Sequence, residues 1–189
     1  MSIKKLDWVL FSVDPVIFTY YQGQLSVLLV RRTIEPFKDY WGLPGGRVDQ
    51  DNAKSLEAAL ALKLEYKTGL KEIFFEQLGT YGADDMDPRG WSVTTAYLAL
   101  VNESEVALVG DAGTAYLWAP FAQLDDFELA FWHSKIIRDA FTRLRDKSLY
   151  TDLPVNLMPE LFTYPMLKEV YEQILDISIS RQRFAKRMD

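Results

Sequence analysis

The most constraining feature of this chain is a glycine-rich loop that leads directly into a helix. The loop spans Trp41-Gly42-Leu43-Pro44-Gly45-Gly46, and glycine permits backbone conformations and close approaches that other residues forbid. A helix is predicted from about residue 55 to residue 67, because neither proline nor glycine interrupts this stretch until Gly69, which suits a C-cap. Its buried stripe is expected to contain Leu56, Leu60 and Leu64. We therefore expect a loop of defined shape rather than a linker.

The rest of the first 148 residues alternates strand-like and helical patterns. Runs rich in Val, Leu, Ile and Phe predict strands at residues 8–18, 25–31, 73–81, 91–101 and 115–118. The first two strands are separated by Tyr20-Tyr21-Gln22-Gly23-Gln24, which suits a hairpin turn. A helix predicted over residues 134–145 completes a mixed α/β unit that ends near residue 148.

A small second unit is predicted after residue 148. Residues 149–160 contain two prolines and little periodicity, so we expect a linker there. Helical patterns over residues 163–175 and 180–188, separated by a short break, are typical of a helix-turn-helix. Around Phe184 as a core anchor, the second helix carries four cations that we expect to contact DNA: Arg181, Arg183, Lys186 and Arg187. The alternative is a solvated C-terminal tail.

Composition narrows the chemistry that the chain can perform. It contains no cysteine and one histidine, which excludes disulfides, thiolate zinc sites and cysteine nucleophiles, so any metal would need oxygen ligands. No stretch approaches the ~20 apolar residues of a membrane span, and we expect a cytoplasmic protein. The formal charge of -6 argues against a surface that binds nucleic acid everywhere, so local basic clusters are more informative than the total.

The loop and the helix together resemble a known motif. The run from Gly45-Gly46-Arg47-Val48 through Glu57-Ala58-Ala59 to Lys67-Thr68-Gly69-Leu70 resembles a Nudix box, a loop-helix-loop with which family members hold a metal-bound diphosphate. The family pattern ends in Arg-Glu-x-x-Glu-Glu-x-Gly, whose glutamates lie on one helix face and share divalent cations. Counted back from Gly69, this chain carries other residues at those four positions: Leu62, Lys63, Tyr66 and Lys67.

These replacements predict a box that cannot support hydrolysis. Two ammonium groups and a phenol replace three carboxylates, which changes the local charge from about -3 to about +2 and would repel magnesium. The remaining Glu57 and Glu65 lie roughly 12 Å apart along the helix axis, too far to chelate one ion. We therefore predict no catalytic residue, no metal site and no cofactor. Lys63 and Lys67 would instead pair directly with a diphosphate; the alternative is that they form only a solvated helix face.

A narrower resemblance covers nearly the whole chain. The runs 75–82, 87–93, 159–172 and 183–187 resemble the Nudix-related transcriptional regulators of NAD metabolism, the NrtR type, and their sugar-responsive relatives. The resemblance implies an α/β fold, a Nudix α/β/α sandwich with a mixed sheet at residues 1–148, followed by a small all-α helix-turn-helix at residues 161–189. It also implies a homodimer whose Nudix domain binds an effector such as ADP-ribose and whose second domain binds operator DNA. Because the family continues into a β-hairpin wing and this sequence stops at Asp189, we expect a partial, truncated winged-helix unit.

Several residues are candidates for the effector site, because this fold gathers its ligand near them. Gly45-Gly46 would shape the loop, and four arginines at strand ends and in loops could contact an anion: Arg31, Arg32, Arg47 and Arg89. Phe37 and Trp91 offer flat apolar surfaces for an adenine ring, but either could instead be a core or lid aromatic. His133 stands where relatives show an Asp-His pair; because Trp132 replaces the acid, we expect a packed or helix-capping histidine beside the ligand rather than a catalytic base.

These observations favour a ligand-responsive transcriptional regulator that is not an enzyme, and two alternatives stay open. The first is a Nudix hydrolase, similar to an ADP-ribose pyrophosphatase, that recruits loop carboxylates such as Asp49, Asp51, Asp84 or Asp85. The second is a degenerate binding module without DNA activity. The arginines and aromatics of the site suit ADP-ribose, NAD fragments and phosphorylated sugars alike.

Overall fold

The computed structural model describes residues 9–49, 51–69, 73–106 and 114–188. Within them, one sheet of seven strands has the order β3-β2-β1-β6-β5, with β4 paired to β1 and β7 paired to β2. The strands are β1 (Leu10–Tyr21), β2 (Gln24–Arg31), β3 (Trp41–Gly42), β4 (Gly46–Arg47), β5 (Phe74–Ala83), β6 (Ser92–Leu100) and β7 (Tyr116–Pro120). β1 and β6 run parallel, whereas the other pairs are antiparallel. The predicted mixed sheet is confirmed.

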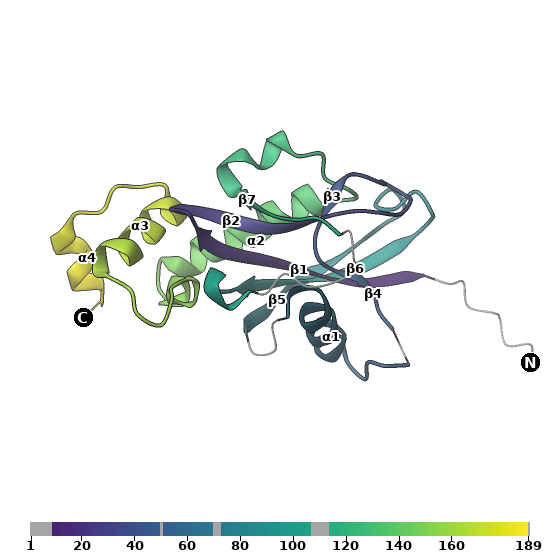
Figure 1. Cartoon of the computed structure of the whole chain (residues 1–189), viewed down its shortest axis with the longest axis horizontal. Coiled ribbons are helices and arrows are strands. Elements are labelled where there is room, and N and C mark those ends of the chain that lie inside the picture. The colour runs from purple at the N-terminus through teal and green to yellow at the C-terminus, as the bar shows by residue number, and fades with distance from the viewer. Residues whose placement is uncertain (1–8, 50, 70–72, 107–113, 189) are drawn as a thin grey trace, which may run out of the picture.

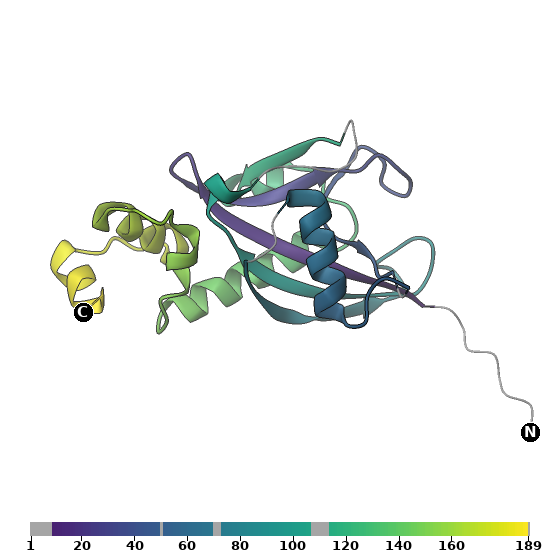
Figure 2. The ribbon, with the colours of Figure 1, turned by 60° about the horizontal axis from the view of Figure 1, so that its bottom comes forward.

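Two helices, α1 (Leu56–Thr68) and α2 (His133–Ser148), cover opposite faces of this sheet (Figure 1, Figure 2). Successive side chains of a strand point to opposite faces, and β1 shows the consequence. Ile17 packs in a cluster with Leu60 of α1, whereas Phe18 packs in a second cluster with Ile137 of α2. This arrangement is the predicted α/β/α sandwich. In the part of the chain that the structure describes, no helix is both long and apolar enough to cross a bilayer.

The ends of α1 are set by its caps, as the sequence predicts. The Ser55 side chain accepts a hydrogen bond from the Ala58 amide, and Gly69 ends the helix in the left-handed region with φ 71°. Leu60 and Leu64 are buried, and Leu56 is partly buried against the same cluster. Leu70, the last residue of the box-like run, lies outside the described residues.

The first hairpin is longer than predicted. β1 continues to Tyr21, and only Gln22 and Gly23 form the turn, both with positive φ, 49° and 82°, as a tight two-residue hairpin requires. The predicted start of this strand at Trp8 lies outside the described residues. Two short 3-10 helices that we did not predict follow β6 and β7: η1 (Glu103–Glu105) and η2 (Phe121–Asp126).

The segment 149–160 is packed, which differs from the expected linker. It contains a third 3-10 helix, η3 (Leu153–Leu157), and Leu153, Leu157 and Met158 are buried in the cluster that also contains residues of α2. The two prolines and the weak periodicity suggested a tether. The apolar side chains of this segment outweigh that signal, because they bury surface against the sandwich.

The last two helices, α3 (Tyr164–Leu175) and α4 (Arg181–Met188), pack at one end of the sheet, on the left in Figure 1. Thr163 caps the start of α3, and Asp176 ends it in the left-handed region. Phe184 of α4 is 1% exposed and contacts the rings of Tyr164 and Tyr171 at 5.6 and 5.5 Å between centroids. The predicted helix pair and its anchor are therefore confirmed.

Candidate functional site

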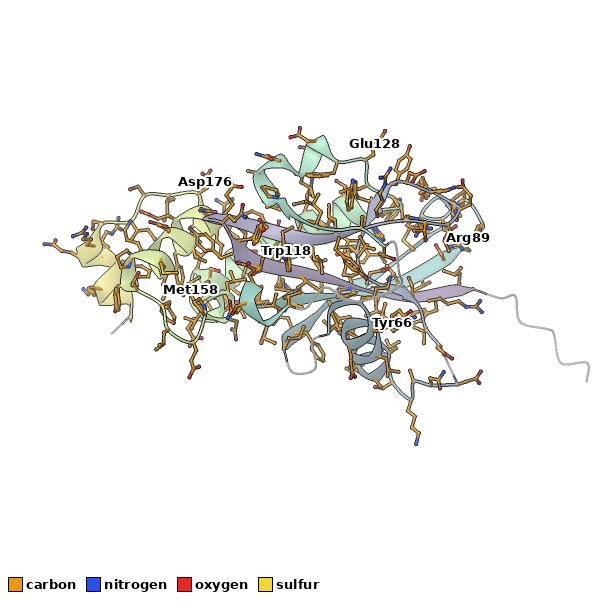
Figure 3. The ribbon with its side chains drawn as sticks, in the orientation of Figure 1. Tyr66, Arg89, Trp118, Glu128, Met158 and Asp176 are labelled. Carbon is orange, nitrogen blue, oxygen red and sulfur yellow. The ribbon has the colours of Figure 1, made fainter. Side chains whose placement is uncertain are left out.

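A cavity of about 490 Å³ lies at the end of the sheet where β1 and β6 begin and β2 ends. The β3–β4 loop, α1, the loop between β5 and β6, and the start of α2 complete its wall. Figure 3 labels two residues of this lining, Tyr66 on α1 and Arg89 in the β5–β6 loop. The cavity and the α3–α4 pair thus occupy opposite ends of the sheet.

Basic side chains dominate the lining. Six of them line the cavity together: Arg31, Arg32, Arg47, Lys63, Lys67 and Arg89. Among the described residues, the acidic side chains in the lining are Asp14 and Asp87. An excess of cations around a hollow of this size suits an anionic ligand. Three further predicted residues also line the cavity: Gly45, Gly46 and His133.

The two glycines allow the β3–β4 loop to approach its neighbours closely. A Cβ atom on Gly45 would overlap the Oδ1 atom of Asp14 and the carbonyl oxygen of Val13. A Cβ atom on Gly46 would lie 3.8 Å from the Nζ atom of Lys63. The glycine pair therefore brings the loop backbone against a carboxylate on one side and an ammonium on the other.

Arg32 is held in place by its own loop. Its Nε and Nη2 atoms donate to the Pro36 carbonyl at 3.0 and 2.7 Å, and Nη2 also donates to the Ile34 carbonyl at 3.3 Å. Its guanidinium lies 4.7 Å from the centre of the Phe131 ring, within cation–π range. Burial, and then the nearby charge of Arg89, lower the pKa of Arg32. Arg32 thus orients the loop and places a fixed charge in the lining.

Arg89 is oriented by Asp87. The Nε and Nη2 atoms of Arg89 donate to the two carboxylate oxygens at 3.0 and 2.7 Å, and Asp87 also accepts the Arg89 amide at 2.9 Å. The hydrogen bond from the guanidinium lowers the pKa of Asp87, so this carboxylate stays ionised. The side chain of Arg89 remains half exposed, which leaves its outer edge available to a ligand.

Asp14 is a site residue that the sequence reasoning missed. It is 7% exposed and accepts hydrogen bonds on Oδ2 from Thr94 at 2.5 Å and from Ser12 at 3.1 Å. A charged residue inside an otherwise apolar strand was the available signal, because a buried carboxylate requires partners or a role.

His133 is packed, as predicted for a histidine without an acidic neighbour. It is the first residue of α2 and is 6% exposed. Its Nδ1 atom accepts a hydrogen bond from the Leu43 amide at 3.0 Å, which places the proton of the neutral ring on Nε2. Burial lowers the pKa of His133, so the ring stays neutral near pH 7.

Two predicted aromatics do not line the main cavity. Phe37 packs with its ring 4.9 Å from Phe131 and 5.5 Å from Tyr40, which agrees with the alternative of a core aromatic, whereas Phe131 itself lines the cavity. Trp91 is 54% exposed and lines a smaller adjoining hollow of about 270 Å³. That hollow shares two cations with the main cavity, Arg47 and Arg89.

The loop carboxylates considered for a hydrolase lie elsewhere. Asp49 accepts hydrogen bonds from the Asn52 side chain and the Asp51 amide, and the bond from Asn52 lowers the pKa of Asp49. Asp84 and Asp85 are not part of the lining. Across the described ranges, no group of three or more His, Asp or Glu side chains is arranged to hold a metal ion.

The basic helix α4 presents its cations to solvent. Arg181, Arg183 and Lys186 are exposed, whereas Phe184 on the other face is buried. Arg187 lies in α4, but its side chain is outside the part that the structure describes. The predicted DNA-contacting side chains that the structure describes therefore lie on the solvent-exposed face of α4, and their contact with DNA stays a prediction.

Two family models match the chain in separate regions. The model of the NUDIX domain matches residues 13–140, and the model of the NrtR DNA-binding winged helix domain matches residues 154–189. The first region contains the whole lining of the cavity except for two residues at its edge, Leu10 and Ser12.

The chain is similar to a curated transcriptional repressor and to solved structures of another regulator. The chain is 41% identical to the ADPR responsive transcriptional repressor NtrR of Acinetobacter baylyi, over 95% of this chain and 72% of that protein. Crystal structures of Shewanella oneidensis NrtR are similar too. The complex with a 27mer DNA has a TM-score of 0.87 at 39% identity, covering 94% and 81% of the two chains. The NUDIX domain complexed with ADP ribose has a TM-score of 0.68 at 41% identity, covering 74% and 90%.

A third relative, an ADP-ribose pyrophosphatase of Methanocaldococcus jannaschii, is 34% identical over 68% of this chain and 70% of its own length. It matches over 129 residues, which is too short to include both regions. The two regulators, by contrast, match across both the cavity and the C-terminal helices. The chain therefore belongs to the NUDIX family and, within it, to the NrtR group of NUDIX-related transcriptional regulators.

Proposed function

We propose that this protein is a transcriptional regulator that binds ADP-ribose in the cavity and operator DNA through α4, and that it does not hydrolyse ADP-ribose. The observation that carries the proposal is the position of Lys63 and Lys67. Both line the cavity at box positions where a hydrolase needs metal-binding carboxylates. The relatives support the same function, since one is named as an ADPR responsive repressor and another was crystallised with DNA and with ADP ribose.

We infer that the lysines take the place of a metal ion. The ammonium of Lys63 lies next to Gly46, so a diphosphate over the glycine loop would meet Lys63 directly. Arg47 and Arg89 line the same space and can add charge-assisted hydrogen bonds. Binding of ADP-ribose should therefore not require a divalent cation. Trp91, beside these two arginines, offers an aromatic surface for the adenine ring.

The same strands that line the cavity also contact the DNA-binding unit. At the far end of the β1–β2 hairpin, Gln173 of α3 donates to the Gly23 carbonyl at 2.7 Å and accepts the Leu25 amide at 2.8 Å. Tyr20 donates to Glu169 of α3 at 3.2 Å. We propose that a ligand at one end of β1 and β2 shifts α3 at the other end, and with it the spacing of the two α4 helices in a homodimer. Such a switch requires the ligand to favour one arrangement over the other.

Calorimetry and product analysis on one sample test this function. Wild-type protein would be titrated with ADP-ribose in excess magnesium and again in EDTA, and each mixture would then be analysed for AMP and ribose 5-phosphate. We expect equal affinity in both buffers and no products. In parallel, fluorescence anisotropy with DNA from upstream of the protein's own gene should report specific binding that ADP-ribose alters. Absence of specific DNA binding would favour the alternative that the protein is a ligand-binding module without DNA activity.

The alternative is hydrolysis, and the pyrophosphatase relative is its support. A hydrolase would need carboxylates outside the box, and the lining offers Asp14 and Asp87. Asp87 is already paired with Arg89, which disfavours a metal there. Magnesium-dependent accumulation of AMP that is abolished by Asp14→Asn would favour this alternative and contradict the proposal.

A further inference from the structure

The floor of the cavity carries a row of polar side chains that the diphosphate contacts do not use. On one face of β1 and β6, apolar core residues such as Val16 give way to Ser12 and Asp14 on β1 and to Ser92 and Thr94 on β6. Ser12 is paired with Thr94 across the parallel strands. All four polar residues line the cavity. A polar row of this kind inside a sandwich is costly unless a partner satisfies it.

The inner end of the row is Asp14. Its Oδ2 atom accepts both hydroxyl groups, from Thr94 and from Ser12. Within the described residues, no donor is hydrogen-bonded to its Oδ1 atom, which lies against Gly45. The carboxylate is thus held in one orientation by two hydroxyls, and it retains the capacity to accept a hydrogen bond from a ligand.

The outer end of the row is Ser92. It is 2% exposed, and its Oγ atom has no hydrogen-bond partner among the described residues. Ser92 is paired with Leu10, four residues before Asp14 on β1, so the two ends of the row are about 13 Å apart at 3.3 Å per residue. The floor therefore offers unused hydrogen-bonding groups at two separated points, which suits an elongated ligand.

The chemistry of Asp14 restricts what can bind at the inner end. A carboxylate needs a donor, whereas an ionised phosphate has no proton to donate and is repelled by the same charge. A sugar hydroxyl is neutral and can donate. Asp14 therefore favours a hydroxyl-bearing group beside it, while the basic side chains of the lining bind the phosphates.

We propose that Asp14 binds the terminal sugar of the ligand and thereby distinguishes a sugar-capped nucleoside diphosphate, such as ADP-ribose, from one that ends in a phosphate, such as ADP. Ser92, at the other end of the row, hydrogen-bonds to the nucleoside half that both ligands share. This inference rests on the proposed function, because it requires a nucleoside diphosphate in the cavity. It adds a specificity-determining residue and the orientation of the ligand.

The test is calorimetric titration of the full chain with ADP-ribose and with ADP. Asp14→Asn should weaken ADP-ribose binding and preserve or strengthen ADP binding, so that the preference for ADP-ribose falls about ten- to a hundredfold. Ser92→Ala should weaken both ligands by the same factor. Ser26→Ala is the matched control, because Ser26 is also a buried strand serine but lies outside the cavity, and it should change neither affinity.

If Asp14→Asn kept the wild-type preference for ADP-ribose over ADP, the proposal would be overturned. It would also be overturned if Ser92→Ala lowered that preference and Asp14→Asn did not. Retained ADP binding shows that the variant is folded. If Asp14→Asn bound neither nucleotide, Thr94→Val would replace it as the test, because this variant removes a hydrogen-bond donor that orients Asp14 and keeps the charge of the carboxylate. A lower preference for ADP-ribose over ADP is expected in Thr94→Val. An unchanged preference would overturn the proposal. Failure of the proposed function is distinguishable from failure of this inference. A wild-type protein that binds neither nucleotide would overturn both, whereas a wild-type protein that binds ADP-ribose, with a preference over ADP that survives Asp14→Asn, would overturn only the inference.

Discussion

The two basic regions of this molecule differ in how their side chains are held. In the cavity, Arg32 is bound to the carbonyls of Pro36 and Ile34, and Arg89 is bound to Asp87. On α4, by contrast, the cations are exposed, and the helix is held in place by the buried side chain of Phe184 on its opposite face. Oriented cations select the shape of a small ligand, since little further ordering is needed on binding. Exposed cations on a rigid helix suit a long polyanion, where charge matters more than individual geometry.

The largest expected effect comes from reversing the charge of the box lysines. Lys63→Glu combined with Lys67→Glu should lower the affinity for ADP-ribose by more than about a hundredfold, because two charge-assisted contacts become repulsive. Isothermal titration would measure the loss, and operator binding without ligand should stay within about twofold of wild type. Lys54→Glu, an exposed change outside the lining, is the control. Unchanged ADP-ribose affinity in the double variant would contradict the role of the lysines.

A second test addresses α4. Arg181→Ala combined with Arg183→Ala should lower operator affinity about tenfold or more and reduce the slope of log affinity against log salt by about 1.8, if each side chain contacts one phosphate. Anisotropy at several salt concentrations would measure both. ADP-ribose affinity should not change, because these residues are at the other end of the sheet from the cavity. A loss of ADP-ribose binding in this variant would contradict the claim that the cavity and α4 bind their ligands through separate sets of residues.

A third test uses pH. Because the pKa of His133 is lowered in the folded protein, the unfolded chain binds a proton more readily, and stability should fall as pH drops below about 6.5. The decrease from this one group is at most about 1.4 kcal/mol per pH unit. His133→Asn, which keeps an acceptor for the Leu43 amide, should show a shallower decrease. Urea unfolding of both proteins at pH 7 and pH 5.5 would measure the difference, and parallel slopes would contradict it.

The smallest expected effect concerns the connection between the regions. Gln173→Ala removes three hydrogen bonds between α3 and the β1–β2 hairpin, to Tyr20, Gly23 and Leu25, each contributing about 1 kcal/mol. The factor by which ADP-ribose changes operator affinity should fall about fivefold, while the separate affinities for ligand and DNA change little. Gln123→Ala, an exposed substitution on η2, is the control. Full coupling in Gln173→Ala would show that the hairpin contact does not transmit the ligand signal.

Local signals explain what the sequence predicted well. The ends of α1 follow from Ser55 and Gly69, which act through neighbouring backbone groups. The position of Phe184 follows from helical periodicity in a basic segment. Nine of the candidate ligand-binding residues line the cavity; they were chosen from segments that resemble those of a known family, and their positions depend on the fold as a whole.

The errors arose where several segments meet. The sequence could have flagged Asp14 as an unusual charge in an apolar strand, but it could not show the partner Thr94, which β6 supplies from 80 positions away. Whether Phe37 is a core aromatic or a ligand contact stayed open in the sequence, because its packing partner Phe131 is a residue far along the chain. The segment 149–160 was expected to be a linker because prolines are visible in the sequence, whereas the surface that buries Leu153 and Leu157 is not.

The shared hydrophobic cluster at the α3–α4 end has a consequence for protein engineering. Leu157, Ile174 and Phe184 belong to the same cluster as Ile137 and Phe18 of the sandwich. The two functional parts are therefore not interchangeable modules. A chimera that joined this sensor to another DNA-binding head near residue 150 would expose the apolar surface that now lies beneath η3 and α3, and it would aggregate unless that surface were redesigned together with the junction.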